Sequence, residues 1–270
     1  MFERVQMFRS LLGGWRYRHF IISSIRNDFV SRFSRSRFGA VWMVLQPLAM
    51  VLIYALILSA VLSARLPGIE SQYAYAIYLT AGILPWTLFL EVVSRSLTMF
   101  IDNSGLIKKI SFPRLALPCI VLGGALVNYF ILFFCAIAVF YLLGYGVGYA
   151  IVWIVPLTLM TALFSVGVGL VLGVLNVFIR DVGQVMSIAF QFLFWLTPIV
   201  YPVSIVPGAI SVGLVFNPLY HIVDAYHQVM VYQQAPSGIA LTTMILVSGA
   251  VMAFGLLLFR KASAEMVDAL

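Results

Sequence analysis

The sequence predicts an all-α integral membrane protein with six transmembrane helices, an N-terminal amphipathic interface helix and a re-entrant helix pair between spans five and six. Of the 270 residues, 63% are hydrophobic and 9% are charged, against about 25% charged residues in soluble domains. The mean hydropathy is +1.07. The apolar runs are continuous, and their lengths are close to the about 20 residues that a membrane-spanning helix needs. Transmembrane strands would instead alternate apolar and polar residues. This composition excludes a soluble enzyme, a disulfide scaffold and a disordered chain.

The first segment, residues 1–38, is basic and predicted to lie in the cytoplasm and at the membrane interface. Within residues 20–38, isoleucines and phenylalanines from Ile21 to Phe33 recur every four positions, and arginines fall on other faces. This pattern is typical of a helix that lies on anionic lipid. Two roles remain open for it: a surface anchor, or a docking element for a cytoplasmic partner.

Six apolar segments follow, and we expect each to cross the membrane. They are residues 42–63, 73–100, 115–143, 150–178, 184–201 and 237–259. Pro85 is expected to kink the second span. The first apolar run begins near Val41, later than in a signal peptide, so we expect no cleaved leader. We treat residues 1–270 as one transmembrane domain, with a six-span core at 39–260 and a cytoplasmic tail at 261–270.

Residues 202–236 are apolar, but prolines, glycines and Asn217 interrupt them. The two pieces, about 204–215 and 219–232, are too short to span. Backbone that turns back at membrane depth is tolerated where protein or a water-filled cavity covers it. We therefore predict a re-entrant pair near the external mouth.

The basic residues are distributed unevenly between the two sides. With a cytoplasmic N-terminus, 14 of the 16 Lys and Arg fall inside: eight arginines up to Arg37, then Lys108, Lys109, Arg114, Arg180, Arg260 and Lys261. Arg65 is the one outside, and Arg95 lies within a span. The positive-inside rule then places both termini in the cytoplasm.

Few ionisable residues lie within the predicted spans. Glu91 and Arg95 are four residues apart in the second span, where they can pair along one helix face and lower the cost of burying either charge. Proton-coupled transporters usually carry several intramembrane acids on different helices. We therefore expect a structural ion pair here rather than proton coupling.

No residue pattern predicts catalysis or a cofactor. Walker A, Gly-rich dinucleotide and HExxH motifs are absent from the sequence. His221, Asp224 and His227 could suggest a metal site, but the histidines are about 120° apart on a helix and no fourth ligand is evident. We expect a hydrogen-bonded polar face and no metal. The glycine clusters at 144–148 and 167–173 are expected to pack helices closely.

Aromatic residues make up 14% of the chain. Those around Phe190 and Phe194, with Tyr201 at the end of the fifth span, suit a conduit in which sugar rings stack on aromatic faces, although packing is the more common role of any single aromatic. The cytoplasmic segments 102–114 and 180–183 are short and charged. They are either ordinary connections or surfaces on which a motor protein could press.

Several stretches together resemble a known family, the membrane (permease) subunits of ABC-2-type polysaccharide exporters. They are Phe38–Pro47, Gly82–Trp86, the Asn103–Arg114 loop with its Lys108-Lys109 and Phe112-Pro113 pairs, Arg180-Asp181 and Asn217-Pro218-Leu219. The resemblance covers essentially the whole chain. It is greatest to the O-antigen exporter permeases, with capsule and teichoic-acid exporters as near relatives.

The resemblance implies a homodimer that binds two separate ATP-binding cassette subunits, which supply the ATP and Mg sites. Such a complex moves a lipid-linked polysaccharide across the bacterial inner membrane. The chain itself would be a transport subunit and not an enzyme, and nothing suggests nucleic-acid binding.

The resemblance also assigns roles to residues. ATPase contacts are implied for Arg26, Arg32, Arg35, Arg37, Asp102, Lys108, Lys109, Arg114, Arg180 and Asp181. Because the first and fifth spans border the conduit in the family, lining residues are implied to include Gln46, Tyr54, Phe190, Phe194 and Tyr201.

Alternative functions remain. The chain could belong to an ABC-2 exporter of capsule, teichoic acid, or a small lipid or drug. A membrane-embedded glycan ligase or glycosyltransferase is a third class, and only the region from His221 to His227 offers residues suited to it.

Overall fold

The computed structural model describes residues 18–33, 38, 41–54, 56, 73–109, 114–146, 148–208 and 213–270. These residues form helices joined by turns, with no strand among them, so the all-helical prediction is confirmed for this part of the chain. In chain order the helices are α2 (Arg18–Phe33), α3 (Val41–Ile53), α5 (Ala74–Asp102), α6 (Ser104–Lys109), α7 (Ala116–Leu142), η2 (Tyr149–Trp153), α8 (Ile154–Phe178), α9 (Asp181–Leu196), η3 (Val203–Ile205), α11 (Pro218–Met230), α12 (Gly238–Ala262) and α13 (Glu265–Ala269).

Four helices are long and apolar enough to cross a membrane: Ala74–Asp102, Ala116–Leu142, Tyr149–Phe178 and Gly238–Ala262. The third of these combines η2 and α8, which follow each other without a break. The four coincide with the predicted second, third, fourth and sixth spans. These predictions are therefore confirmed as helices of spanning length and composition.

The predicted first and fifth spans coincide with shorter apolar helices, α3 with 13 residues and α9 with 16. Residues 57–63 of the predicted first span lie outside the described residues. The fifth span was predicted to reach Tyr201, but α9 ends at Leu196. Thr197 precedes Pro198 and is extended, with φ −104° and ψ 129°, because a following proline disfavours the helical conformation. Six spans remain a prediction.

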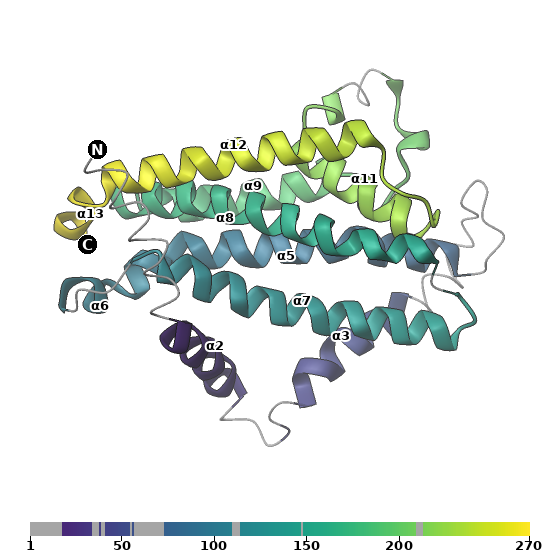
Figure 1. The fold of residues 1–270 in the computed structure, drawn as a ribbon, viewed down its shortest axis with the longest axis horizontal. Coiled ribbons are helices and arrows are strands. Elements are labelled where there is room, and N and C mark those ends of the chain that lie inside the picture. The colour runs from purple at the N-terminus through teal and green to yellow at the C-terminus, as the bar shows by residue number, and fades with distance from the viewer. Residues whose placement is uncertain are drawn as a thin grey trace.

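Helix α5 is the centre of the described bundle. It contacts α7, α8, α9 and α11 and runs between α7 and α8 (Figure 1). Within its most apolar stretch, 83% of the residues are buried in the molecule, against 17% for α12. Pro85 lies inside α5, which continues through it as one helix. The outer helices thus present apolar surface that a bilayer can cover, and α5 forms the protein core.

Glycines bring α8 close to its neighbours on both sides. A Cβ atom at Gly167 would lie 2.7 Å from the backbone N of Met252 in α12, and one at Gly255 would lie 2.7 Å from the carbonyl O of Gly167. Toward α5, a Cβ at Gly173 would lie 2.5 Å from the carbonyl O of Ser96. Close packing is therefore confirmed for this cluster.

The prediction of close packing is wrong for Gly144 and Gly146. A Cβ atom at either position would meet nothing within 4 Å. Gly144 instead ends α7: its φ is +84°, and the next amide, that of Tyr145, donates to the carbonyl O of Phe140 at 2.9 Å. Glycine is favoured at this helix end because it has no Cβ to oppose a left-handed conformation.

Helix α11 covers most of the second predicted re-entrant piece. Asn217 caps it by accepting from the amide of Leu219 at 3.0 Å, and Pro218 occupies the first turn, where its missing N–H costs nothing. The helix contacts α5, α8 and α12. Of the first piece, residues 209–212 lie outside the described residues. A re-entrant path for the pair remains a prediction.

Candidate functional site

The basic residues of the helix ends gather at one end of the bundle. Because α5, α8 and α12 end there and α7 and α9 begin there, the end collects Lys108, Arg114, Arg180, Arg260 and Lys261, as the positions of α6, α13 and the C-terminus show (Figure 1). Among the described residues, no Lys or Arg lies at the opposite end. The uneven distribution of Lys and Arg in the sequence is therefore also found in the molecule, where the same end carries the acids Asp102, Asp181, Glu265 and Asp268 as well.

The C-terminal residues fold back onto this end. Helix α13 contacts α6 and α8, and the side chain of Met266 is 1% exposed. The Arg114 guanidinium donates from Nη1 to both the carbonyl O and the hydroxyl Oγ of Ser263. The predicted tail thus ties the segment before α7 to the end of α12.

Asn176 connects three helices just behind the Arg180-Asp181 turn. This buried side chain donates from Nδ2 to the carbonyl O of Leu97 in α5 at 2.8 Å. Its Oδ1 accepts from the amide of Gly183, in the first turn of α9, at 3.0 Å. The exposed turn is therefore rigidly linked to the central helix.

The implied ATPase contacts occupy different settings. Lys108, Arg180 and Asp181 are exposed at the basic end, whereas Asp102 borders a cavity of about 600 Å³ between α2, α5 and α7. Arg35, Arg37 and the side chains of Arg32 and Lys109 lie outside what the structure describes.

Helix α2 places its predicted apolar stripe against α7. Ile21, Ile25 and Phe29 are partly buried, and Arg26 is exposed. A Cβ atom at Gly123 of α7 would lie 2.3 Å from Cδ1 of Ile25, so the isoleucine occupies the space that this glycine leaves. The apolar stripe is therefore confirmed for these residues, but the face that carries Arg26 also carries the exposed Ile22 and Val30, so α2 is not cleanly two-sided.

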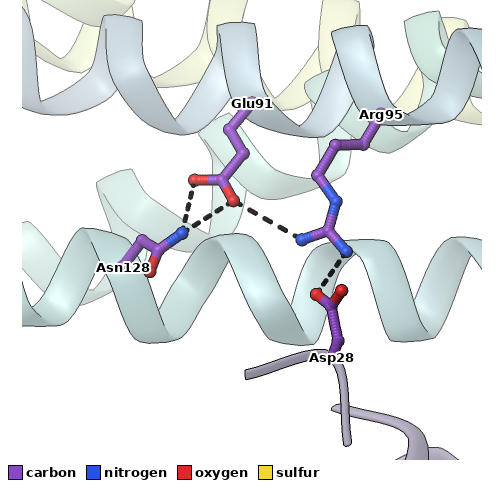
Figure 2. Close-up of polar contacts among 4 residues, drawn as sticks. All are labelled: Asp28, Glu91, Arg95 and Asn128. Carbon is purple, nitrogen blue, oxygen red and sulfur yellow. Dashed lines mark hydrogen bonds and ion pairs between the residues drawn. The ribbon is translucent and has the colours of Figure 1, made fainter. Parts of the chain in front are cut away.

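A polar network joins α2, α5 and α7 (Figure 2). The predicted pair is present: Arg95 Nη1 lies 3.5 Å from Glu91 Oε1. Arg95 Nη2 also lies 2.6 Å from Asp28 Oδ2 of α2. From α7, Asn128 Nδ2 donates to both Glu91 carboxylate oxygens, at 2.7 and 3.0 Å. The intrahelical pair of the prediction is thus the centre of a three-helix contact.

Two implied conduit residues line a groove of about 740 Å³ between α5 and α9. Phe190 is 6% exposed and meets Phe89 edge-on with ring centroids 6.2 Å apart. Phe194 lies edge-on to Trp86, with a centroid distance of 5.4 Å. The groove also carries the polar side chains of Ser94, Thr98, Ser187 and Gln191.

The other implied conduit residues lie elsewhere. Gln46 lines a separate cavity of about 260 Å³ with Glu91 and Asn128. Tyr54 is partly buried against the core. Tyr201 donates from its hydroxyl to the carbonyl O of Trp195 at 2.7 Å. Within one chain, the structure therefore brings together Phe190 and Phe194 but not the whole implied set.

The histidines of α11 make hydrogen bonds, as predicted, but they do not form one polar face. The ring of His227 is 3% exposed, stacks on Tyr78 with centroids 3.7 Å apart and bonds through Nε2 to the carbonyl O of Tyr78 at 3.0 Å. His221 Nε2 bonds to the carbonyl O of Val215 at 2.9 Å. Among the described residues, no group of three or more His, Cys, Asp or Glu could hold a metal ion.

Sequence reasoning missed Asp28, Asn128 and Asn176. The two asparagines are isolated amides within long apolar segments, and that isolation is a usable signal because a polar group in such a segment needs a partner. Asp28 gives no comparable signal, since an acid on an interface helix is ordinarily solvated.

A known protein family and several known proteins are similar to this chain over most of its length. The family model of the ABC-2 type transporter membrane domain matches residues 20–231. The chain is 30% identical to the O-antigen export system permease protein RfbA of Klebsiella pneumoniae over 199 residues, which cover 71% of this chain and 72% of the relative.

Two further relatives extend over more of the chain. A second protein of that name, from Myxococcus xanthus, is 26% identical over 248 residues, covering 90% of this chain and 92% of the relative. The polysialic acid transport protein KpsM of Escherichia coli is 25% identical over 243 residues, covering 88% and 91%. The resemblance noted from the motifs is confirmed: this chain belongs to the ABC-2 type transporter membrane family.

Proposed function

We propose that the chain is the transmembrane subunit of an ATP-driven exporter that moves lipid-linked polysaccharide, of the O-antigen type, across the bacterial inner membrane. The family and the names of the relatives support a polysaccharide exporter in general. The observation that supports it most is the groove between α5 and α9, which is both aromatic and polar.

The groove offers the two kinds of contact that a sugar needs. Trp86, Phe190 and Phe194 present apolar ring faces and edges, on which the C–H faces of a sugar can stack. Ser94, Ser187 and Gln191 offer hydroxyl and amide groups to sugar hydroxyls. A groove of weak, repeated contacts suits a polymer that must slide, because a tightly bound sugar would not be released.

The energy would come from a partner. With no nucleotide motif in the sequence, we propose that a homodimer of this chain binds two ATP-binding subunits that carry ATP and Mg. Their closure would press on the basic end, where Lys108 and Arg180 are exposed. Asn176 supports this proposal because its amide links that end to the central helix, α5.

The proposal includes a topology. Both termini lie in the cytoplasm, because the basic end then faces inward as the positive-inside rule requires. Six spans are formed if α3 and α9 cross the membrane together with the four long helices, and α11 enters and leaves from the periplasmic side. Tyr201 and Gln46 border the conduit only when two copies meet.

Capsular polysaccharide is the second candidate substrate. It is favoured by the KpsM relative, named for polysialic acid transport, which aligns with 88% of this chain. Teichoic acid and small lipids or drugs are further candidates within the same transporter class. A glycan ligase or transferase is disfavoured, because Nε2 of His221 and Nε2 of His227 each bond to a backbone carbonyl group.

Deletion of the gene in its native bacterium tests the function. We expect lipid-linked polysaccharide to accumulate on the cytoplasmic face of the membrane, with export restored by the unaltered chain and reduced by Phe190→Ala or Phe194→Ala. Phe254→Ala is the matched control, because this ring on α12 is 58% exposed and does not line the groove. Unchanged export after deletion, or failure to purify together with an ATP-binding subunit, contradicts the proposal.

A further inference from the structure

The network around Arg95 links α2 to α5, two helices that otherwise touch little. Arg95 and Asp28 border the cavity of about 600 Å³ under α2. Glu91 and Asn128 border the cavity of about 260 Å³ under α3. The network thus stands between two hollows, and the apolar packing of α2 is against α7 rather than α5.

The Arg95 side chain reaches α2 because α7 makes room for it. A Cβ atom at Gly124 would lie 2.6 Å from Arg95 Nη1. At the preceding residue of α7, which is Gly123, the space of the missing side chain is filled by Ile25 of α2. The two consecutive glycines of α7 therefore leave space for both side chains of the α2 contact, Ile25 at Gly123 and Arg95 at Gly124.

The orientation of the guanidinium is set from both sides. Glu91 lies on the same helix, one turn before Arg95, and Asn128 holds the Glu91 carboxylate with two hydrogen bonds. Arg95 then directs its other terminal nitrogen toward Asp28 (Figure 2). The side chains of Arg95 and Asp28 are only 23% and 28% exposed, so the pair is partly shielded from water and screened less than a surface pair.

We propose that Arg95 is a positioning residue for export, which holds the interface helix α2 on α5 and α7 through Asp28. The proposal rests on the proposed function, because it adds the docked α2 to the basic end as a second element that passes the movement of the ATPase to the bundle. Arg95 touches no substrate in this role. Glu91 and Asn128 act through it by fixing its direction.

Cysteine crosslinking measures the docking of α2. In the full chain with its ATP-binding partner, Cys119 and Cys135 are replaced by Ala, and Ile25→Cys is combined with Gly123→Cys. Asp28→Asn should lower the crosslinking yield about fivefold, as expected for the loss of one partly exposed ion pair. Asp28→Glu keeps the carboxylate and should restore most of the yield.

A variant that keeps the net charge of α2 tests whether the effect comes from the ion pair with Arg95 or from the charge of the helix. Val30→Asp combined with Asp28→Asn moves the carboxylate to an exposed position that does not border the cavity with Arg95. We expect crosslinking and the amount of polysaccharide exported per ATP hydrolysed to fall as in Asp28→Asn. The amount of assembled complex and its rate of ATP hydrolysis should stay unchanged, which a merely misfolded variant would not show.

A steric variant tests the same contact without changing any charge. With Gly123 and Ile25 unaltered, Gly124→Ala should lower export per ATP, because the added methyl group displaces the guanidinium. Gly249→Ala on α12 is its control, since a Cβ there meets nothing within 4 Å. Arg95→Gln is less decisive, because it removes a cation from beside Glu91 and endangers folding.

Two results would overturn the proposal: crosslinking that does not depend on Asp28, or normal export per ATP in the variant with the displaced carboxylate. If the unaltered chain exports no polysaccharide, the proposed function fails instead. The crosslinking still decides whether Arg95 holds α2, because it needs no substrate.

Discussion

The α8–α12 interface and the α2 docking contact hold helices together by different means. At Gly167 and Gly255 the two backbones approach so closely that a single methyl group would meet main-chain atoms at 2.7 Å. At α2, the long side chain of Arg95 reaches Asp28 at 2.6 Å. The first contact is backbone against backbone, and the second is a charged bridge beside a cavity.

This difference indicates which helices can move. The backbone contact between α8 and α12 allows only one relative position of the two helices, because main-chain atoms cannot rotate away as side chains can. An ion pair on a flexible side chain can separate and form again at a cost of about 1 kcal/mol. We infer that α5, α8 and α12 behave as one body and that α2 is the adjustable part. The following variants test this division.

The largest effect is expected from Gly255→Ala. The added methyl group would lie 2.7 Å from the carbonyl O of Gly167, and overpacking of this kind costs about 1–3 kcal/mol. Unfolding in mixed detergent micelles measures the loss of stability. Gly249→Ala on the same helix should cost nothing, and equal losses in both variants would show that the contact is not tight.

Asn176→Leu should have the next largest effect. It removes the amide that bonds to Leu97 and Gly183, and a lost buried hydrogen bond costs about 1–3 kcal/mol. Hydrogen exchange at the start of α9 should accelerate together with the loss of stability. Gln184→Ala, an exposed amide nearby, is the control. Unchanged hydrogen exchange would show that the Asn176 side chain does not hold the start of α9 to α5 and α8.

Tyr226→Phe should have a smaller effect. The Tyr226 hydroxyl lies 3.0 Å from both the Tyr129 hydroxyl and Thr158 Oγ1, joining α11, α7 and α8. One interhelical hydrogen bond in a membrane protein contributes about 0.6 kcal/mol on average. The two bonds of this hydroxyl together predict a loss of about 1 kcal/mol in the same unfolding assay, and Tyr149→Phe, at a ring 99% exposed, should show none.

The smallest effect on stability is expected from the combined Lys108→Glu and Lys109→Glu variant. Lys108 is exposed, and such surface changes alter stability by about 0.5 kcal/mol or less. Export should nevertheless fall while ATP hydrolysis continues, if this end receives the force. Normal export would remove these lysines from the proposed coupling surface.

Elements that depend on continuous apolar composition were predictable. The spans around α5, α7, α8 and α12 follow from runs long enough to cross a bilayer, and Glu91–Arg95 follows from a four-residue spacing. The end of α9 was predicted too late, because the local effect of Pro198 on Thr197 outweighs the apolar residues beyond it. The Gly144 cluster was misread because spacing alone does not reveal whether a helix continues.

The sequence by itself determined the helical membrane class, the basic bias and the family, because these depend on composition and on local order along the chain. Only the tertiary structure decided that Arg95 meets Asp28, 67 residues away, and that Asn176 joins three helices. Their partners come from other helices, and which faces meet depends on where glycines let backbones approach. The aromatic residues likewise became a candidate sugar groove only when α9 was placed against α5.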